Sequence, residues 1–350
     1  MRKENVKVII WGLGAMGRGM AEMLLDKKGI EITGVIDMGT MLGKSMFDFL
    51  DKDNPYDHDI TIGTAEEVIT EKAADVVLLC TDSHTRNAFP RIKTILEHKM
   101  NVITTAEEMA FPQAKEPELA AEMDRIAKAN GVSVLGTGIN PGLIMDLLVV
   151  TLTGACETVD FVEAKRVNNL SPFGPTVMKE QGVGITMDEY EELSGAGKLA
   201  GHVGFDESIH MIADALGWKL SEPVKQSMSP IISKVDRKAP YAEVKAGNMA
   251  GVDMRGEGKV DDVVKINMIH PQQVEPQLEG VDTGDYINIK GTPDINMAIT
   301  PEIPGGIGTI AMVVNMIPQI INARPGLQTM LDLPVPRAIM GDVRERIEED

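Results

Sequence analysis

Three glycines near the N-terminus have the spacing of a turn that binds a dinucleotide. The apolar run 6–10 predicts a strand, and an amphipathic helix is predicted directly after the glycines, with Met20, Met23 and Leu24 on one face. In such a turn the glycines permit a tight bend, a close approach of a diphosphate and close packing of helix on strand. A plain strand–helix turn is the alternative interpretation. The residues predicted to contact the cofactor here are Gly12, Leu13, Gly14, Ala15, Met16 and Gly17.

An acidic residue follows the last of these glycines by twenty positions. Asp37 ends a second apolar run, 31–36, and a carboxylate at this position accepts hydrogen bonds from the ribose hydroxyls of adenosine and repels a 2′-phosphate. No arginine stands among the next three residues, Met38, Gly39 and Thr40. The sequence therefore predicts NAD as the preferred cofactor, with NADP possible because Lys44 is close in sequence.

Polar segments follow three later strands of the same predicted sheet. They are 81–84, 106–109 and 137–142, and ligands of a doubly wound sheet bind beyond the carboxyl ends of its strands. We expect the nicotinamide half of the cofactor to run past Thr81, Ser83, Ala106 and Asn140.

Three carboxylates in these segments are candidates for proton transfer or for binding an amine. Clustered carboxylates can hold an ammonium group, and a buried one can act as acid or base. Each could instead be a helix cap or a partner of a helix dipole. We predict that Glu108 or Asp82 is the catalytic base and that Glu107 contacts the substrate; no metal site is predicted.

Further polar residues stand after residue 160. The planar guanidinium of Arg166 suits a substrate carboxylate, although a surface salt bridge is equally compatible with the sequence. His202, between two glycines, is a candidate proton shuttle or a structural cap. The predicted substrate contacts in this region are Arg166, Asn168, Ser171 and Thr176.

The order of predicted elements indicates two domains. Strands and helices alternate over residues 1–153, which predicts an α/β fold with about six parallel strands in a doubly wound Rossmann sheet. Residues 154–305 have irregularly spaced strands and predict an α+β domain with a mostly antiparallel sheet; 306–350 are expected to return to the first domain. Strands are expected at 6–10, 31–36, 59–62, 75–81, 101–105, 132–136, 159–167, 242–246, 263–269 and 285–290, and helices at 66–71, 87–98, 116–130, 142–153, 207–217 and 306–322.

Composition excludes some classes of partner. The 350 residues carry a formal net charge of −19, which opposes binding to nucleic acid or to an anionic membrane surface. Only Cys80 and Cys156 are present, and with no visible signal peptide they favour a reducing compartment, the cytoplasm. The apolar stretch 307–321 is too short to span a bilayer comfortably and predicts a buried helix.

Four motifs together resemble the 2,4-diaminopentanoate dehydrogenase family. They are NVIT with AEEMAFP (101–112), GTGINPG (136–142), RVNNLSPFGPTVMK (166–179) and GHVGFDESIHMIADALGW (201–218), and the third is the most specific. The resemblance covers nearly the whole chain. It implies an N-terminal Rossmann domain and an α+β domain for substrate and dimerisation, as in dihydrodipicolinate reductase and meso-diaminopimelate dehydrogenase.

The resemblance also implies a reaction. That family catalyses NAD(P)-dependent oxidative deamination of 2,4-diaminopentanoate at C4, giving 2-amino-4-oxopentanoate and ammonia in ornithine degradation. It further implies a homodimer through the second domain's sheet. One departure is that the segment after Asp37 lacks the basic residue expected of a member that uses both cofactors.

Two other functions remain open from the sequence. A related amino-acid dehydrogenase, with meso-diaminopimelate as substrate, would have the same architecture. A regulator that senses NAD without turnover is the alternative of a different class, although no basic stripe or extra domain is visible. Lysine is absent after the fifth strand, where related sugar oxidoreductases need it, and both cysteines are expected to be core residues rather than nucleophiles.

Overall fold

The computed structural model describes residues 2–348, and the chain divides into two compact units. Unit 1 comprises residues 1–143 and 305–350, and unit 2 comprises residues 144–304. The C-terminal segment thus belongs to the same unit as the N-terminal strands. The helix Leu147–Thr153, expected in the first domain, belongs to unit 2 instead.

Unit 1 is built on a seven-stranded sheet. Its order is β15-β6-β5-β4-β1-β2-β3, and every neighbouring pair is parallel. This confirms the predicted doubly wound sheet and adds one edge strand, because β15 pairs with β6. The strands are β1 (Val6–Trp11), β2 (Ile30–Ile36), β3 (Ile62–Gly63), β4 (Val76–Leu79), β5 (Asn101–Thr104), β6 (Ser133–Gly136) and β15 (Gly326–Gln328).

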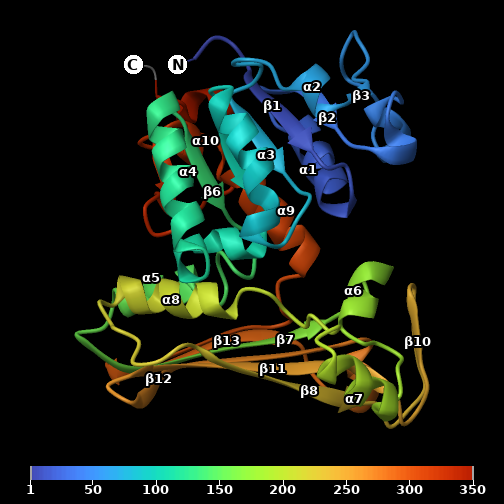
Figure 1. Cartoon of the computed structure of the whole chain (residues 1–350), viewed down its shortest axis with the longest axis vertical. Coiled ribbons are helices and arrows are strands. Elements are labelled where there is room, and N and C mark those ends of the chain that lie inside the picture. Colours follow the sequence, from blue (N-terminus) through green and yellow to red (C-terminus); the bar gives the residue numbers. More distant parts are fainter. Residues whose placement is uncertain (1, 349–350) are drawn as a thin grey trace. The chain divides into compact units, whose positions relative to one another are not determined.

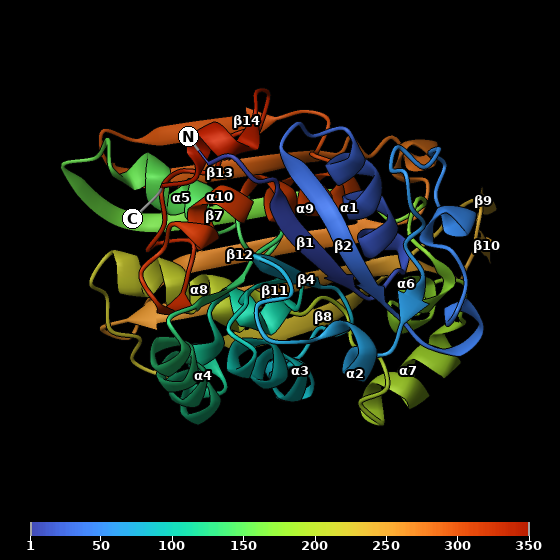
Figure 2. The same ribbon diagram turned by 90° about the horizontal axis from the view of Figure 1, so that it is seen from above.

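Helices cover both faces of this sheet. Figure 2 shows α3 and α4 on one face and α1, α9 and α10 on the other. The expected helix 306–322 is divided into α9 and α10, with Pro318 near the start of the second. The helices are α1 (Ala15–Leu25), α2 (Ala65–Val68), α3 (Thr85–Glu97), α4 (Pro117–Asn130), α9 (Gly305–Asn315) and α10 (Ile317–Ile321), with 3₁₀ turns η1 (Gly39–Met41), η2 (Met46–Phe49), η3 (Glu107–Ala110), η4 (Pro112–Ala114) and η6 (Val343–Arg346).

Local chemistry explains where several of these helices begin and end. Thr64 and Glu67 form a reciprocal capping box at the start of α2. Gly131 ends α4 in the left-handed conformation, with φ of 69°. Gly19 lets α9 approach α1, because a Cβ there would lie 2.2 Å from Ile310 Cδ1. These features fix the start of α2, the end of α4 and the packing of α9 on α1.

Unit 2 contains a six-stranded, mostly antiparallel sheet, as predicted. Its order is β14-β13-β7-β12-β11-β8, and only β7 and β12 are parallel neighbours. The strands are β7 (Thr158–Asn169), β8 (Lys225–Ile232), β11 (Met249–Val260), β12 (Val263–Gln273), β13 (Gly284–Thr292) and β14 (Ile295–Ile299).

Two helices of unit 2 lie on one face of this sheet, α5 (Leu147–Thr153) and α8 (Phe205–Ala215) (Figure 1). Glycines in β11 allow the close approach of α8. A Cβ at Gly256 would lie 2.8 Å from the Phe205 ring, and one at Gly258 would lie 2.7 Å from Ile209 Cγ2. The two helices are joined by the Ser208 hydroxyl, which donates to Asp146 Oδ2 at 2.8 Å.

A separate hairpin packs on the loop that follows β7. The hairpin is β9 (Arg237–Ala239) with β10 (Ala242–Val244), and the loop carries α6 (Pro175–Glu180). Apolar residues of both form one small buried cluster that includes Leu170, Met178, Ala239 and Val244. The remaining elements of unit 2 are α7 (Met187–Gly195) and η5 (Pro276–Glu279).

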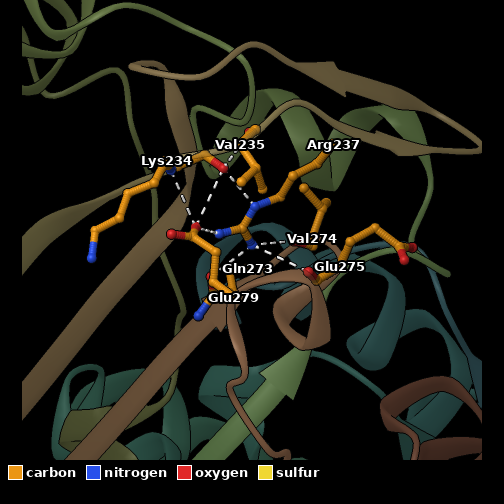
Figure 3. A network of polar contacts seen from close by, with 8 residues as sticks. Lys234, Val235, Arg237, Gln273, Val274, Glu275 and Glu279 are labelled. Carbon is orange, nitrogen blue, oxygen red and sulfur yellow. Dashed lines mark hydrogen bonds and ion pairs between the residues drawn. The ribbon is translucent and has the colours of Figure 1, made fainter.

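A buried arginine ties this hairpin to the end of β12. Arg237 forms an ion pair with Glu279, and its Nη1 donates to Gln273 Oε1 at 2.8 Å and to the Val274 carbonyl at 2.6 Å. Figure 3 shows the guanidinium between the segment that begins at Lys234 and the segment that ends at Glu279. Its Nε donates to Ser233 Oγ at 2.7 Å. The network fixes the hairpin, and through the apolar cluster it supports the loop after β7.

Candidate functional site

The glycine-rich turn between β1 and α1 has the geometry of a diphosphate-binding turn. Gly12 has φ of +101°, and a Cβ there would lie 2.9 Å from the Cys80 carbonyl oxygen. A Cβ at Gly17 would lie 1.9 Å from the Gly12 oxygen, so a side chain is excluded at both positions. A Cβ at Gly14, by contrast, would meet nothing within 4 Å. The space that an incoming phosphate needs is therefore open at Gly14.

The start of α1 also suits an anion. Gly14 is its N-cap without a side-chain hydrogen bond, and the first turn contains no acidic residue. The backbone N–H groups of this turn and the helix dipole favour negative charge. All six residues predicted for this turn, 12 to 17, lie in this one bend, and they fit the diphosphate of a dinucleotide.

Asp37 lies directly beside this turn. Its Oδ2 accepts from the Leu13 N–H at 2.5 Å and its Oδ1 accepts from the Met38 N–H at 2.6 Å. The carboxylate therefore bridges the glycine-rich turn and the end of β2. It is half-buried, which leaves part of it accessible to a ligand.

The other strand ends of unit 1 form the same edge of the sheet. Thr81 and Ser83 follow β4, Ala106 follows β5, and Asn140 lies in the turn after β6. The turn after β6 is tight, since Gly142 has φ of +125° and a Cβ there would lie 2.5 Å from the Gly138 nitrogen. The predicted nicotinamide contacts are thus brought to one edge, as parallel strands require.

Asp82 is bonded to residues of its own strand end and of α3. Its Oδ2 accepts from Thr81 Oγ1 and from Arg91 Nη1, both at 2.7 Å. Asp82 and Arg91 line a shallow hollow beside α3, together with Arg86, Asn87 and Pro90.

Glu108 is buried, with 7% of its surface exposed, at the start of η3. Its Oε2 accepts from the Thr85 N–H at 2.8 Å, its Oε1 lies 3.1 Å from His84 Nδ1, and Lys115 Nζ is 3.7 Å away. Gly136 permits this placement, because a Cβ there would lie 2.2 Å from the Met109 carbonyl carbon. Glu108 is therefore a buried carboxylate in contact with an exposed histidine.

Glu107 precedes it in η3 and is half-buried. The η3 turn is also bonded to the segment that follows β4, because the Glu108 N–H donates to the Ser83 carbonyl at 3.1 Å. The structure thus brings Glu107 and Glu108 together with the end of β4, as the sequence predicts for adjacent parallel strands.

In unit 2, Arg166 lies in a buried ion pair. Its side chain is 2% exposed; Nη1 donates to Asp285 Oδ1 at 2.5 Å and Nη2 to the Ile303 carbonyl at 2.6 Å. Asp285 Oδ2 accepts from the Ile303 N–H at 2.9 Å. Burial raises the pKa of Asp285, and the Arg166 charge opposes that rise. Arg166 is therefore not a surface salt bridge, and its Nη1 and Nη2 each bond to a group within unit 2.

Two histidines lie on the same side of the sheet. The His202 and His270 rings have centroids 4.8 Å apart, and His270 Nδ1 lies 2.8 Å from the Arg166 carbonyl oxygen. Burial and the Arg166 charge lower the pKa of His202 to about 4, and burial lowers the pKa of His270 well below its usual range. Both rings are thus neutral at pH 7, and His270 donates through Nδ1.

The other predicted substrate contacts have different environments. Asn168 lies on β7 beside Gln272 of β12, and both are 4% exposed. Within the described residues, Asn168 Oδ1 and Gln272 Nε2 have no hydrogen-bond partner. Ser171 is occupied, since its Oγ accepts from the Glu275 N–H at 2.9 Å, whereas Thr176 is exposed on α6.

Among residues 2–348 we find no metal site, and the thiol of Cys80 is not reactive. No group of three or more His, Cys, Asp or Glu side chains there could hold a metal ion. Burial raises the pKa of the Cys80 thiol to about 12, which makes it a poor nucleophile. In the same residues no helix is both long and apolar enough to cross a bilayer.

Residues 143–349 match the family model described as the 2,4-diaminopentanoate dehydrogenase C-terminal domain. The 2,4-diaminopentanoate dehydrogenase of Acetoanaerobium sticklandii is 66% identical over 347 residues, covering 99% of this chain and 98% of that protein. The chain belongs to the 2,4-diaminopentanoate dehydrogenase family. The resemblance found in the sequence is thereby confirmed, and with it an enzyme of the amine dehydrogenase type.

Two solved structures of dehydrogenases are similar to this chain in fold. The amine dehydrogenase of Mycobacterium smegmatis superposes with a TM-score of 0.81 at 25% identity, over 96% of this chain and 98% of that one. A meso-DAPDH variant of Clostridium tetani, 14% identical over 94% of this chain and 95% of that one, has a TM-score of 0.50 and shares the fold. A dehydrogenase of this family uses a nicotinamide cofactor, and the turn at 12–17 fits its diphosphate.

Sequence reasoning missed several residues that the structure places at these sites. Arg18 follows the last glycine directly, and its Nε donates to the Leu13 carbonyl at 3.1 Å. His270 and Gln272 are two positions apart in β12 and lie on the same face of the strand, but no local motif marks them. Asp285 becomes visible only as the partner of Arg166, 119 positions away.

The contrast between two glycines is directly testable. Gly14→Ala should raise the Kd of NADH roughly tenfold or more, because the methyl group occupies the open space and displaces phosphate hydrogen bonds. Its stability should be nearly unchanged, since Gly14 has φ of −71° and no neighbour within 4 Å. Fluorescence titration and thermal unfolding measure the two effects.

Gly17→Ala is the matched variant. The methyl group would overlap the Gly12 carbonyl, and the free energy of unfolding should fall by about 1–3 kcal/mol. Equal loss of stability in both variants would contradict this description of the turn.

Proposed function

We propose that the chain catalyses the NAD(P)-dependent oxidative deamination of 2,4-diaminopentanoate at C4, giving 2-amino-4-oxopentanoate and ammonia. The observation that carries the proposal is 66% identity, over 99% of this chain, with a 2,4-diaminopentanoate dehydrogenase. The glycine-rich turn of unit 1 supports it with a fitting cofactor site. Such identity does not favour meso-diaminopimelate as the substrate.

The bond to be broken defines what the protein must do. The C4 amine has to be neutral before the C4 hydrogen leaves with its electron pair, so a protein base accepts one proton from the ammonium group. The nicotinamide ring supplies the acceptor for that hydride. The remaining iminium is stabilised by a nearby carboxylate, and water then adds to C4 before ammonia leaves.

Glu108 is the proposed base. It is a buried carboxylate whose Oε1 lies 3.1 Å from the exposed His84, which offers a path for the proton to solvent. Asp82 is the less favoured candidate, because it is less buried than Glu108 and its carboxylate forms an ion pair with Arg91 at 2.7 Å. Glu107 is proposed to contact the substrate ammonium group.

In unit 2 we assign substrate binding to Asn168, whose buried Oδ1 has no partner among the described residues. Thr176 remains a proposed contact. Arg166 is assigned a positioning role through Asp285 and Ile303, and Ser171 holds the loop after β7. His202 is proposed to act as a neutral imidazole, consistent with its lowered pKa.

For the cofactor we propose a preference for NAD, with NADP also accepted. The accessible part of the Asp37 carboxylate suits ribose hydroxyls, and its bonds to Leu13 and Met38 hold it beside the turn. Two free cysteines, Cys80 and Cys156, support placement of the enzyme in the cytoplasm.

The substrate is tested by NADH or NADPH formation at 340 nm. Purified protein should turn over 2,4-diaminopentanoate and remain silent with meso-diaminopimelate and ornithine. Each substrate is offered with NAD and with NADP. Turnover of meso-diaminopimelate alone, or of none of the three, would contradict the proposal.

The base is tested by Glu108→Gln. This change keeps an oxygen to accept from the Thr85 N–H but removes the proton acceptor, so kcat should fall about 10²- to 10⁴-fold while the Kd of NADH stays the same. Asp82→Asn should reduce kcat far less. Glu118→Gln, in the first turn of α4, is the control, and a wild-type kcat for Glu108→Gln would remove Glu108 from this role.

A homodimer through the sheet of unit 2 is also proposed. On the face opposite α5 and α8, Glu163 accepts from Asn267 Nδ2 at 2.9 Å and from Asn288 Nδ2 at 3.1 Å, which makes a flat polar ladder across three strands. In the described part of unit 2, no helix packs on the middle of this face (Figure 1).

Light scattering should give twice the mass of one chain. Ile269→Glu introduces a charge on the same face and should shift the protein toward the monomer, whereas Ile307→Glu, at an exposed position of α9, should not. A wild-type monomer at micromolar concentration would refute the dimer.

A further inference from the structure

Two cationic side chains converge on one aromatic ring in unit 1. Arg18 Cζ lies 5.4 Å from the centroid of Phe49, and Lys44 Nζ lies 5.8 Å from the same centroid. Both distances are in the range of cation–π contacts. Arg18 belongs to α1 and Phe49 ends η2, while Lys44 lies in the segment between η1 and η2. The fold thus gathers two positive charges from separate segments.

Arg18 lies next to Asp37 through a shared residue, Leu13. Arg18 Nε donates to the Leu13 carbonyl at 3.1 Å, and Asp37 Oδ2 accepts from the Leu13 N–H at 2.5 Å. The guanidinium and the carboxylate are therefore both bonded to the main chain of one residue in the glycine-rich turn. Any adenosine ribose held by Asp37 has Arg18 as a neighbour.

The carboxylate of Asp37 is bonded to the main chain through both oxygens. They accept from two backbone N–H groups, those of Leu13 and Met38, and the dipoles of these groups oppose the field of the carboxylate. Repulsion of a second anion by Asp37 is correspondingly weaker than for a bare carboxylate. With Arg18 and Lys44 counted, the formal charge of the three side chains at this end of the cofactor site is positive.

We propose that Arg18 and Lys44 form the binding site for the 2′-phosphate of NADP. An arginine offers a planar fork of N–H donors to phosphate, and a lysine offers a compact charge. The Phe49 ring holds both side chains in place before the phosphate arrives, which lowers the entropy lost on binding. The proposal rests on the proposed function, and it gives that enzyme a structural basis for using both cofactors.

The two cations come from outside the segment that directly follows Asp37. That segment has no adjacent basic residue, but Arg18 precedes Asp37 on α1 and Lys44 follows it by seven positions. The two cations become neighbours of the site only in the folded chain.

The test compares equilibrium binding of NADPH and NADH, measured by the fluorescence of the reduced nicotinamide without any substrate. Lys44 is exposed, so Lys44→Gln is the cleaner variant. It should raise the Kd of NADPH about tenfold and change the Kd of NADH less than about twofold, because only the phosphate contact is lost. Arg18→Gln should shift the same ratio in the same direction.

Lys93→Gln is the matched control, since it removes an equal charge from α3, on the opposite face of the sheet. Neither Kd should change in that variant. An equal rise of both Kd values in Lys44→Gln, an unchanged Kd for NADPH, or failure of the wild type to bind NADPH would each overturn the proposal.

A second probe separates this proposal from the proposed function. Adenosine 2′,5′-bisphosphate lacks the nicotinamide, and calorimetry should show tighter binding of it to the wild type than to Lys44→Gln. Equal affinity would overturn the phosphate site. Loss of turnover with diaminopentanoate, with this difference retained, would instead refute the proposed reaction alone.

Discussion

Along the carboxyl edge of the parallel sheet, main chain packs directly on main chain at positions occupied by glycine. Gly17 contacts the Gly12 carbonyl, Gly12 contacts the Cys80 carbonyl, and Gly136 contacts the backbone of Met109. These contacts place the glycine-rich turn against the end of β4, and η3 against the end of β6. The position of Glu108, and of the turn that Asp37 bridges, depends on these approaches being free of side chains.

In unit 2 a buried charge pair fixes the chain where it leaves the sheet. Arg166 and Asp285 are almost inaccessible, and between them they bond to both polar groups of the Ile303 backbone. A charge pair removed from water is costly unless its remaining donors and acceptors are bonded. Here the peptide at Ile303 supplies those bonds, so the pair fixes the point at which the chain leaves the sheet of unit 2.

Much of unit 1 could be predicted because its signals are local. The glycine spacing, the buried run at β4 and the glycine that ends α4 all act within a few residues. In unit 2 several elements were not expected, namely β8, β9, β11, β14, α6 and α7. Strand β11 is the clearest case, because Gly256 and Gly258 make room for Phe205 and Ile209 and thereby remove the apolar side chains that would mark a strand.

In the candidate site too, some residues could be predicted from local sequence and others only from contacts in the folded chain. Residues 12–17 and Asp37 could be found from spacing, whereas the partners of Arg166 and the cations on Phe49 depend on contacts between distant segments. An arginine on a strand has the same appearance in sequence whether it meets a ligand or a buried aspartate. Its role is decided by what the fold places opposite it.

The Arg237 network determines which segments must be replaced together when a chimera is made with a related protein. The guanidinium bonds to side chains or carbonyls at Ser233, Gln273, Val274 and Glu279, which come from two separate stretches of chain. A chimera whose new β9–β10 hairpin lacks the arginine would leave the Glu279 carboxylate without its counterpart. Residues 233–244 and 273–279 therefore form one module for recombination, although 28 residues of chain separate them.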